Sequence, residues 1–383
     1  MVRKKIAVLG STGSIGNTLL KIVDKNKSNF NIILLTANKD YKTLLKQAIK
    51  FKVKNLIITN SNSYKILKNK CKKLNIKVYN NFDNLNIIFK KKIDYVMNSI
   101  VGFSGLEPTV DIIKYTKKIA IANKESIICG WNLIQKKLKK YKTEIIPVDS
   151  EHFSIWSLLN SYKIDEKLKL DKVIQNMIIT ASGGPFLNTK INEFKKIKVK
   201  NAIKHPTWKM GKKISIDSAT LVNKLFEVIE AQRLFGVKIN KIHIKIHPDS
   251  YIHCVIKFKN GLIKFCAHEP DMSIPILNSL NINKDFGLNK SINFKILNNL
   301  KFSNVNKKKF LVISLLKNYP NHCTLYDTAL VSINDVLVNL FLENKIKFPD
   351  ISQYLIKILK TNEIKKLKNI VPKNYNEIRQ IND

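Results

Sequence analysis

The sequence predicts an α/β protein with an N-terminal Rossmann-like, doubly wound parallel sheet, a central α+β domain and a C-terminal helical bundle. Strand-like apolar runs alternate with helical patterns up to about residue 148, and a glycine-rich turn joins the first strand to the first helix. From about residue 311 onward, apolar side chains recur at helical spacing. We therefore expect domains at 1–148, 149–285 and 311–383, with a polar connector at 286–310.

The composition is that of a soluble globular protein, with 383 residues of which 44% are hydrophobic and 25% charged. No apolar run approaches the roughly 20 residues that a transmembrane helix needs. The first residues, Met1 to Lys5, lead directly into a strand-like run, so we expect no signal or transit peptide and a cytoplasmic, bacterial-type protein. Five cysteines without a CxxC pair indicate free thiols in a reducing compartment.

The formal net charge of +40 invites a nucleic-acid interpretation, but the distribution of the charge does not favour it. A nucleic-acid surface typically concentrates arginines and aromatic residues on one face. Here the arginines are Arg3, Arg233 and Arg379, and the remaining basic residues are lysines spread from end to end. We expect no specific nucleic-acid binding, but a salt-sensitive attraction of anions that would also favour small anionic substrates.

The first strand-like run, residues 5–9, is followed by the turn GSTGSIG and then by an amphipathic helical stretch. Gly10, Gly13 and Gly16 let the backbone approach a pyrophosphate closely, and the helix N-terminus provides free N–H groups for it. The spacing is a variant of the usual GxGxxG, and a plain tight turn between strand and helix is the alternative. The turn therefore indicates that the chain binds a dinucleotide cofactor.

The second strand-like run, residues 30–36, ends at Ala37, Asn38 and Lys39. NAD-specific proteins usually place an acidic residue there to hold the ribose 2′-hydroxyl, whereas a basic residue suits a 2′-phosphate. The sequence therefore favours NADP. Further strand-like runs at 55–59, 95–98 and 118–122 continue the parallel sheet.

Asn123, Lys124 and Glu125 follow the run at 118–122, at the carboxyl edge of the predicted sheet. Ligands of open α/β sheets bind at this edge. Lys124 is explained equally well as a ligand contact and as a surface charge.

Two carboxylates one residue apart, Asp149 and Glu151, follow the next apolar run. We expect them in extended backbone, where alternate side chains point the same way. Paired oxygens of this kind can hold Mg²⁺ or Mn²⁺, although acidic residues at a strand end are commonly just solvated.

A strand-like run at 176–181 enters the Ser-Gly-Gly turn at 182–184, which either exposes donors suited to a phosphate or forms a surface hairpin. The segment 205–211 carries Trp208 and Met210 and is typical of a mobile lid. Packing of the tryptophan into a neighbouring core is the alternative.

Asp217 and Ser218 predict the cap of a helix over 219–231. In that helix Asn223, Lys224 and Glu227 gather on one side, because residues three and four apart are neighbours. The group is either a solvated face with an internal ion pair or a phosphate grip beside a metal-binding carboxylate.

Taken in order, the chain contains the motifs GSTGSIG, VGxxGLxPT, ANKES, PVDSEH, SGGPF, HPxWxMGxKIS, DSAT, NKxxE and EPDM. This ordered set resembles the 1-deoxy-D-xylulose-5-phosphate reductoisomerase family of the non-mevalonate isoprenoid pathway, over about residues 5–285 and more weakly to the end. The resemblance implies a homodimeric enzyme that uses NADPH and Mg²⁺ or Mn²⁺ to convert 1-deoxy-D-xylulose 5-phosphate into 2-C-methyl-D-erythritol 4-phosphate. The middle domain would then be the catalytic domain.

The resemblance also implies roles for single residues. It implies metal ligands at Asp149, Glu151 and Glu227, which together with Lys124 form the catalytic set. It implies substrate contacts at Lys124, Ser150, Glu151, Ser182, His205, Ser218, Asn223, Lys224 and Glu227. It implies cofactor contacts at Gly10, Thr12, Gly13, Ser14, Ile15, Gly16, Ala37, Asn38, Lys39, Asn123, Glu125 and Gly211, and a lid at Trp208 and Met210.

Some positions depart from the family pattern: Asn38 replaces a usual glycine, Leu225 and Phe226 replace a usual Gly-Leu, and Asp335 replaces a usual glutamate. Two other readings stay open. One is another NADP-dependent reductase of a small phosphorylated or semialdehyde substrate, for which Cys129 is the candidate nucleophile. The other is a basic nucleic-acid-binding protein.

Overall fold

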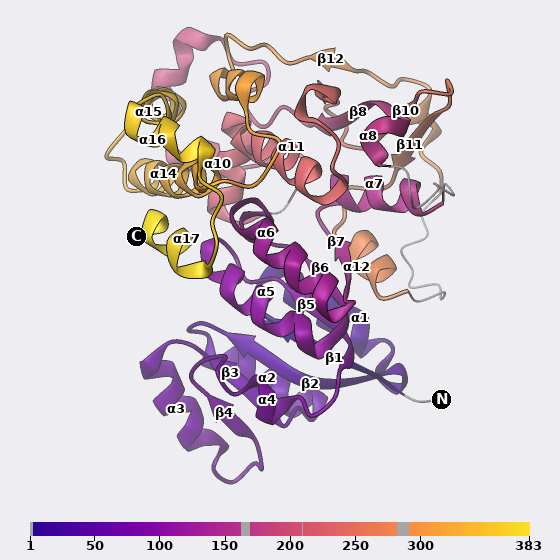
Figure 1. Cartoon of the computed structure of the whole chain (residues 1–383), viewed down its shortest axis with the longest axis vertical. Coiled ribbons are helices and arrows are strands. Elements are labelled where there is room, and N and C mark those ends of the chain that lie inside the picture. The colour runs from indigo at the N-terminus through magenta and orange to yellow at the C-terminus, as the bar shows by residue number, and fades with distance from the viewer. Residues whose placement is uncertain (1–2, 162–168, 209, 282–290) are drawn as a thin grey trace. The chain divides into compact units, whose positions relative to one another are not determined.

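The computed structural model describes residues 3–161, 169–208, 210–281 and 291–383, which form two compact units (Figure 1). The first unit comprises Met1–Ser126, Leu133–Asp149 and Met272–Lys290, and the second comprises Ile127–Asn132, Ser150–Asp271 and Ser291–Asp383. The C-terminal helices thus share a unit with residues 150–271. This grouping differs from the three domains expected from the sequence, which we keep as a proposal for the functional parts of the chain.

The first unit contains a seven-stranded parallel sheet in the order β4-β3-β2-β1-β5-β6-β7. Residues 6–9 in the central strand are fully buried, as in a sheet that is covered on both faces. The strand order reverses at β1, so its carboxyl end is the kind of switch point at which such sheets bind ligands. The predicted Rossmann-like sheet is confirmed. Its strands are β1 (Lys4–Leu9), β2 (Phe30–Ala37), β3 (Asn55–Ile58), β4 (Lys77–Tyr79), β5 (Ile93–Asn98), β6 (Thr116–Ile121) and β7 (Glu144–Pro147).

The helices of the first unit begin where side chains can cap them. Asp40 accepts a 3.0 Å hydrogen bond from the Thr43 N–H at the start of α2, and Asn60 caps α3 in the same way. The late helix α12 packs on α1, and its Ser279 hydroxyl lies 2.7 Å from the hydroxyl of Tyr95, which explains why this segment joins the first unit. The helices are α1 (Ser14–Asp24), α2 (Tyr41–Phe51), α3 (Ser61–Cys71), α4 (Leu85–Ile88), α5 (Leu106–Ile112), α6 (Lys124–Tyr141, shared with the second unit) and α12 (Ser273–Ser279).

The second unit contains a five-stranded mixed sheet in the order β11-β10-β8-β9-β12. One face of this sheet carries buried side chains such as Ile179, Cys254 and Ile256, and helix α7 packs on β10 and β11. The edge strand β12 comes from the segment that we expected to be an irregular connector, because Ser303 pairs with Ile246. The strands are β8 (Ile174–Ala181), β9 (Ile242–Ile246), β10 (Ile252–Phe258), β11 (Ile263–Ala267) and β12 (Ser303–Asn304).

The C-terminal helical region is confirmed, and polar bonds tie it to the middle of the chain. The buried Arg233 on α11 pairs with Asp327 on α14 at 3.0 and 3.1 Å, and Asn334 on α14 donates a 2.8 Å hydrogen bond to Asp217 on α10. The helices of this unit are α7 (Ser150–Asn160), α8 (Leu170–Val173), α9 (Val199–Ala202), α10 (Lys212–Thr220), α11 (Val222–Phe235), α13 (Phe294–Leu297), α14 (Leu325–Leu342), α15 (Phe348–Leu359), α16 (Asn362–Lys366) and α17 (Tyr375–Asn382).

Helix α14 is long and apolar enough, by length and composition, to cross a membrane. It is nevertheless 61% buried within the protein and packs on α10, α15 and α17. A core helix of a globular protein has these properties, so α14 is the central support of the C-terminal helices.

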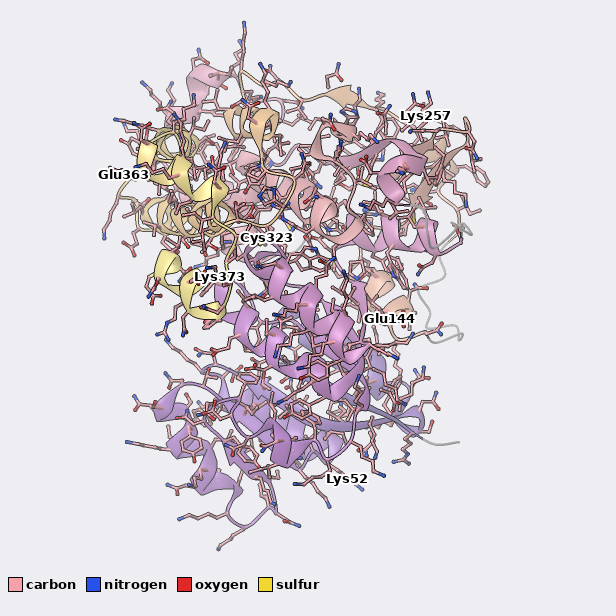
Figure 2. All side chains as sticks on the ribbon, in the orientation of Figure 1. Lys52, Glu144, Lys257, Cys323, Glu363 and Lys373 are labelled. Atoms are coloured by element: carbon pink, nitrogen blue, oxygen red, sulfur yellow. The ribbon has the colours of Figure 1, made fainter. Side chains whose placement is uncertain are left out.

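Lysines on widely separated elements give the chain its charge (Figure 2). Lys52 lies after α2, Lys257 lies on β10 and Lys373 lies before α17, and all three are exposed. The absence of specific nucleic-acid binding stays a prediction.

Candidate active site

A helix, α7, begins where the sequence predicted extended backbone, and this changes how the acidic pair is presented. Strand β7 ends at Pro147 and α7 starts at Ser150, so Asp149 precedes a helix and Glu151 lies in its first turn. The extended backbone expected for this pair is therefore wrong. The carboxylates still converge, because one oxygen each from Asp149, Glu151 and Glu227 lies within 4.8 Å of the others.

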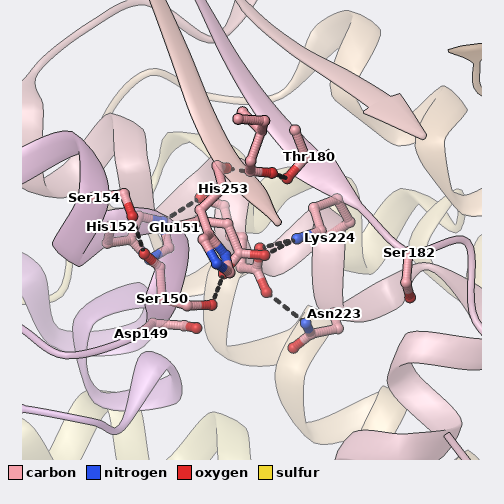
Figure 3. A network of polar contacts seen from close by, with 12 residues as sticks. Asp149, Ser150, Glu151, His152, Ser154, Thr180, Ser182, Asn223, Lys224 and His253 are labelled. Carbon is pink, nitrogen blue, oxygen red and sulfur yellow. Dashed lines mark hydrogen bonds and ion pairs between the residues drawn. The ribbon is translucent and has the colours of Figure 1, made fainter. Parts of the chain in front are cut away.

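Lys224 pairs with two of these carboxylates, and Figure 3 shows its ammonium group pointing toward Glu151. Its ammonium group is 2.6 Å from Glu151 and also pairs with Glu227, while the Asn223 amide donates to the second oxygen of Glu227. The side chains of Lys224 and Glu227 are 6% and 1% exposed. The sequence left open whether this group was a solvated face, and the structure shows a buried polar cluster.

The helix that carries this cluster starts later than predicted. Leu221 adopts a left-handed backbone conformation that ends α10 at Thr220, and α11 begins at Val222. Ser218 therefore lies in the last turn of α10 instead of capping the following helix. The break brings the end of α10 and the start of α11 together, so that Ser218 and Asn223 lie on either side of one sharp turn.

The ion pairs control the protonation of the cluster. Burial by itself would raise the pKa of Glu151, but the adjacent Lys224 ammonium outweighs burial and holds this pKa well below its ordinary value. Burial would likewise lower the pKa of Lys224, but Glu151 and Glu227 together raise it. Both groups are therefore charged at neutral pH.

Ser182 and His205 form a second polar pair in the same unit. The His205 Nδ1 atom accepts backbone hydrogen bonds from Thr207 and Trp208 at 3.2 and 3.0 Å, so the ring proton is on Nε2. Nε2 then donates to the Ser182 hydroxyl oxygen at 3.1 Å, and the Gly184 N–H donates to the same oxygen. Because this oxygen accepts both bonds, the Ser182 proton can be donated to an anion. Burial, with a contribution from Lys224, lowers the pKa of His205 to about 4, which agrees with a neutral ring.

The expected lid is attached to this pair. Through Thr207 and Trp208 the lid backbone is bonded to His205, and the Trp208 ring lies edge-on to His253 with centroids 6.2 Å apart. Trp208 and Met210 are each half-buried, and Gly211 is exposed just before α10. Lys209 lies outside the described residues.

In the first unit, the start of α6 presents the residues expected at the sheet edge. Asn123 caps this helix by accepting a 2.6 Å hydrogen bond from the Ser126 N–H, and its amide donates to the Gly102 carbonyl. Lys124 pairs with Asp149 at 2.5 Å, and Glu125 is buried in the first turn. Lys124 is therefore a buried charge that neutralises Asp149.

The glycine-rich turn has the geometry of a phosphate cradle. Gly10 has a positive φ of 77°, and a Cβ atom there would lie 2.8 Å from the Ser99 carbonyl oxygen. A Cβ atom at Gly16 would lie 2.5 Å from the Gly10 oxygen. Gly13 precedes α1 without a side-chain cap, so the first N–H groups of α1 remain to receive an anion. Thr12, Ser14 and Ile15 line this turn.

At the end of β2 the side chains agree with the NADP preference. Ala37 is buried, whereas Asn38 and Lys39 are exposed. Asn38 stands where the family usually has a glycine. Its amide donates a 2.8 Å hydrogen bond to the Thr59 hydroxyl, which holds this turn in place. The Lys39 ammonium is thereby left on an exposed edge where it can meet a 2′-phosphate.

The sequence missed four polar side chains beside the cluster. His152 bonds to the Glu227 carbonyl oxygen at 2.8 Å and lies 3.3 Å from Glu230. His253 stacks on His268 with centroids 3.7 Å apart, and its pKa is lowered to about 3 by burial and by the neighbouring ring. His152 could have been noticed beside Glu151, but the other three gave no local pattern.

The arrangement combines three convergent carboxylates, a buried ammonium and a neutral serine–histidine pair. Carboxylate oxygens are the ligands that hard divalent cations prefer, and the ammonium and hydroxyl groups suit a phosphate. A cysteine nucleophile is not presented, because Cys129 is fully buried within α6. The semialdehyde dehydrogenase reading therefore has no support at this position.

Three family models match the chain. A model for 1-deoxy-D-xylulose 5-phosphate reductoisomerase matches residues 6–130, a model for the C-terminal domain of that enzyme matches residues 145–235, and a further DXP reductoisomerase C-terminal domain model matches residues 268–383. Together they span all but short stretches of the sequence.

Known proteins agree with these matches. The 1-deoxy-D-xylulose 5-phosphate reductoisomerase of Pelagibacter ubique (strain HTCC1062) is 55% identical over 383 residues, covering 99% of this chain and 97% of its own. The enzyme of Wolbachia pipientis subsp. Culex pipiens (strain wPip) is 38% identical, covering 91% and 88%.

Solved structures show the same likeness. The reductoisomerase from Zymomonas mobilis in complex with NADPH has a TM-score of 0.85 at 29% identity, covering 100% of this chain and 96% of its own. A DOX-P reductoisomerase in complex with NADPH, fosmidomycin and magnesium has a TM-score of 0.88 at 29% identity, covering 99% and 95%.

Proposed function

Because the chain belongs to the 1-deoxy-D-xylulose 5-phosphate reductoisomerase family, we propose that the cluster around Glu151, Lys224 and Glu227 is its reaction centre. The enzyme is an NADPH-dependent oxidoreductase that converts 1-deoxy-D-xylulose 5-phosphate into 2-C-methyl-D-erythritol 4-phosphate and uses a divalent cation such as Mg²⁺. The observation that carries the assignment of the centre is the convergence of three carboxylate oxygens within 4.8 Å of one another.

The donor set fits a hard divalent cation. Asp149, Glu151 and Glu227 each offer an oxygen ligand. Their charge is balanced by Lys124 at Asp149 and by Lys224 at the two glutamates. We propose that Mg²⁺ or Mn²⁺ is held by these three side chains, where it supplies charge stabilisation at substrate oxygens during rearrangement and reduction.

The side chains around the carboxylates orient the substrate. Lys124 pairs with Asp149 at 2.5 Å, and Ser150 lies between Asp149 and Glu151 in the chain. Each offers a donor to the oxygen atoms of the sugar. Ser150 at present donates to the Glu151 carboxylate at 2.5 Å, so substrate binding would redirect a hydroxyl that is already held in place. Orientation of this kind lowers the entropic cost of reaction.

The phosphate end of the substrate fits the second polar pair. Ser182 can donate its hydroxyl proton, His205 holds that hydroxyl in place, and Ser218 and Asn223 flank the break between α10 and α11. Lys224 supplies the positive charge of this group, and contact with a phosphate requires it to release one of its two glutamates. Phosphate binding remote from the reacting carbons provides orientation.

NADPH fits the glycine-rich turn of the first unit. The backbone at Gly10 and Gly16 leaves no room for a side chain, and the uncapped start of α1 offers N–H groups to the pyrophosphate. Lys39 would hold the 2′-phosphate, and Asn123, Glu125 and Gly211 are further cofactor contacts that we propose from the family pattern. The bound cofactor supplies the hydride for reduction.

The lid is proposed to close over the substrate. Trp208 and Met210 are half-buried, and the attachment of the lid backbone to His205 couples the lid to the phosphate-binding pair. A phosphate that engages Ser182 would therefore order the segment that excludes water from the reaction.

We also propose a homodimer and a cytoplasmic location. The outer face of the second-unit sheet exposes Ile263 and Phe265 at 56% and 53% on the edge strand β11, and a second copy of the chain would cover this apolar surface. All five cysteines are free thiols, which suits a reducing compartment. Sedimentation of wild-type and Phe265→Lys protein tests the dimer, and cell fractionation tests the location.

One assay tests the function. NADPH consumption is followed by absorbance with and without 1-deoxy-D-xylulose 5-phosphate and with and without Mg²⁺. We expect consumption to require both additions, and metal-independent consumption would contradict the proposed role of the carboxylates.

A further inference from the structure

Two cysteines of the second unit lie directly opposite each other on neighbouring strands. In the antiparallel pair of β10 and β11, Cys254 is the register partner of Cys266. Directly opposed residues of such a pair have Cα atoms about 4.5–5.5 Å apart and side chains on the same face of the sheet. Disulfides span Cα separations of roughly 4.4–6.8 Å, so the backbone already has the spacing that a disulfide needs.

The environment of the pair makes one thiol reachable. Cys254 is fully buried, whereas Cys266 is half-buried near the edge of the sheet, and both are free thiols. Burial raises the pKa of both thiols, so only a small fraction of each is thiolate at neutral pH and exchange is slow. Proximity, and not thiol acidity, therefore favours a bond between them.

Ser154 on helix α7 lies against the cysteine pair. Ser154 donates its hydroxyl proton to the Ser150 carbonyl oxygen at 2.7 Å. Burial raises the pKa of the Cys266 thiol, and a side-chain contact with Ser154 lowers it. Helix α7 packs on β10 and β11, so the contact of Cys266 with Ser154 joins the cysteine pair to the helix whose first turn presents Ser150 and Glu151.

We propose that Cys254 and Cys266 are a redox modification site, which closes reversibly into a cross-strand disulfide when the enzyme meets a small-molecule disulfide and thereby lowers its turnover. The effect on turnover rests on the proposed function of Ser150 and Glu151, whereas the bond itself does not. A disulfide at this position changes the sulfur that Ser154 contacts, so the packing beneath the first turn of α7 changes.

The chemistry balances as two successive thiol–disulfide exchanges. The Cys266 thiolate attacks one sulfur of the small disulfide, forms a mixed disulfide and releases one small thiolate. The Cys254 thiolate then attacks the Cys266 sulfur and displaces the second small thiolate. In total the two protein thiols lose two electrons and two protons, and one small disulfide is reduced to two small thiols.

The test treats the full-length protein with oxidised glutathione, blocks the remaining thiols by alkylation and maps cross-linked peptides by mass spectrometry. We expect the number of free thiols to fall by two from the five in the sequence, with a single Cys254–Cys266 cross-link. NADPH consumption should fall in proportion to the cross-link and return after reduction with dithiothreitol. Retention of all five thiols, or glutathione adducts without a cross-link, would overturn the proposal.

Matched variants separate the two parts of the proposal. Cys254→Ala and Cys266→Ala should lose no further activity on oxidation, relative to the same variant kept reduced, whereas Cys71→Ala, which removes a buried thiol from the first unit, should respond like wild type. A cross-link that forms without loss of turnover would overturn the link through Ser154. If the untreated protein lacked reductoisomerase activity, the proposed function would fail, but the cross-link would still be decided by mass spectrometry.

Discussion

The Lys224 ammonium lies 2.6 Å from a carboxylate oxygen of Glu151, and the two side chains are only 6% and 12% exposed. Glu227 engages the same ammonium, so one positive charge is shared by two proposed metal ligands. A buried charge is stable when it is paired, and costly when its partner is removed. The cluster therefore links the proposed metal site and the proposed phosphate site to stability in one network.

Replacing Glu227 by glutamine should remove one metal ligand while leaving the fold intact. We expect turnover to fall about 100-fold or more, because groups that stabilise developing charge in the transition state commonly contribute that much. The measurement is NADPH consumption at saturating Mg²⁺, with circular dichroism to check the fold. The exposed Glu343→Gln variant, whose carboxylate only pairs with Lys345, serves as the control and should keep full activity.

Replacing Lys224 by methionine should destabilise the metal-free protein. Glu151 and Glu227 would then be buried without their shared cation, which costs roughly 3–5 kcal/mol for a broken buried pair. Mg²⁺ should recover part of this loss, because it supplies positive charge to the same carboxylates. Denaturant unfolding of the variant with and without Mg²⁺ tests this, and equal stability in both conditions would contradict the assignment.

The pH dependence of stability should report on His205. Its pKa is about 4 in the folded protein and 6.5 in its unperturbed state, so below pH 6.5 the unfolded chain takes up a proton that the folded protein does not. Stability contributed by the neutral ring is thus present above pH 6.5 and is lost as the pH falls toward 4. His205→Gln should show a shallower slope over this window in denaturant titrations. Parallel slopes would contradict the neutral ring.

The pairing of Arg233 with Asp327 should be essential for the C-terminal helices. Asp327 is completely buried and also accepts hydrogen bonds from the Tyr319 hydroxyl and the Thr324 N–H. Asp327→Ala should therefore cost roughly 3–5 kcal/mol of unfolding free energy. The exposed pair of Arg379 and Asp383 provides a comparison, because Arg379→Ala should cost less than about 1 kcal/mol. Similar losses in the two variants would show that burial does not decide the effect.

Lys39 should set the preference for NADPH over NADH. A charge-assisted hydrogen bond to the 2′-phosphate contributes about 1.5 kcal/mol, so Lys39→Ala should lower the ratio of kcat/KM for NADPH to kcat/KM for NADH by roughly tenfold. The value of kcat with saturating NADPH should change little. The neighbouring exposed Lys42→Ala, which lies one residue into α2, is the control; an unchanged ratio in Lys39→Ala would place the 2′-phosphate elsewhere.

Much of the site could be predicted because its residues lie in local patterns. The glycine-rich turn and the acidic pair were visible as short motifs, and their resemblance to one family gave their order meaning. The local structure predicted for the acidic pair and for Ser218 was nevertheless wrong. The acidic pair was expected on a strand and Ser218 at a helix cap, because helix boundaries depend on single residues such as Leu221, whose left-handed conformation the sequence did not reveal.

The sequence by itself determined the α/β fold class and the glycine-rich turn, since these follow from periodicity and from motifs within a few residues, and its resemblance to one family implied the proposed ligands. The tertiary structure decided which distant groups meet. It placed Lys224 between Glu151 and Glu227, bonded His205 to Ser182, and set Cys254 opposite Cys266. Contacts of this kind depend on packing and strand register, which no local pattern specifies.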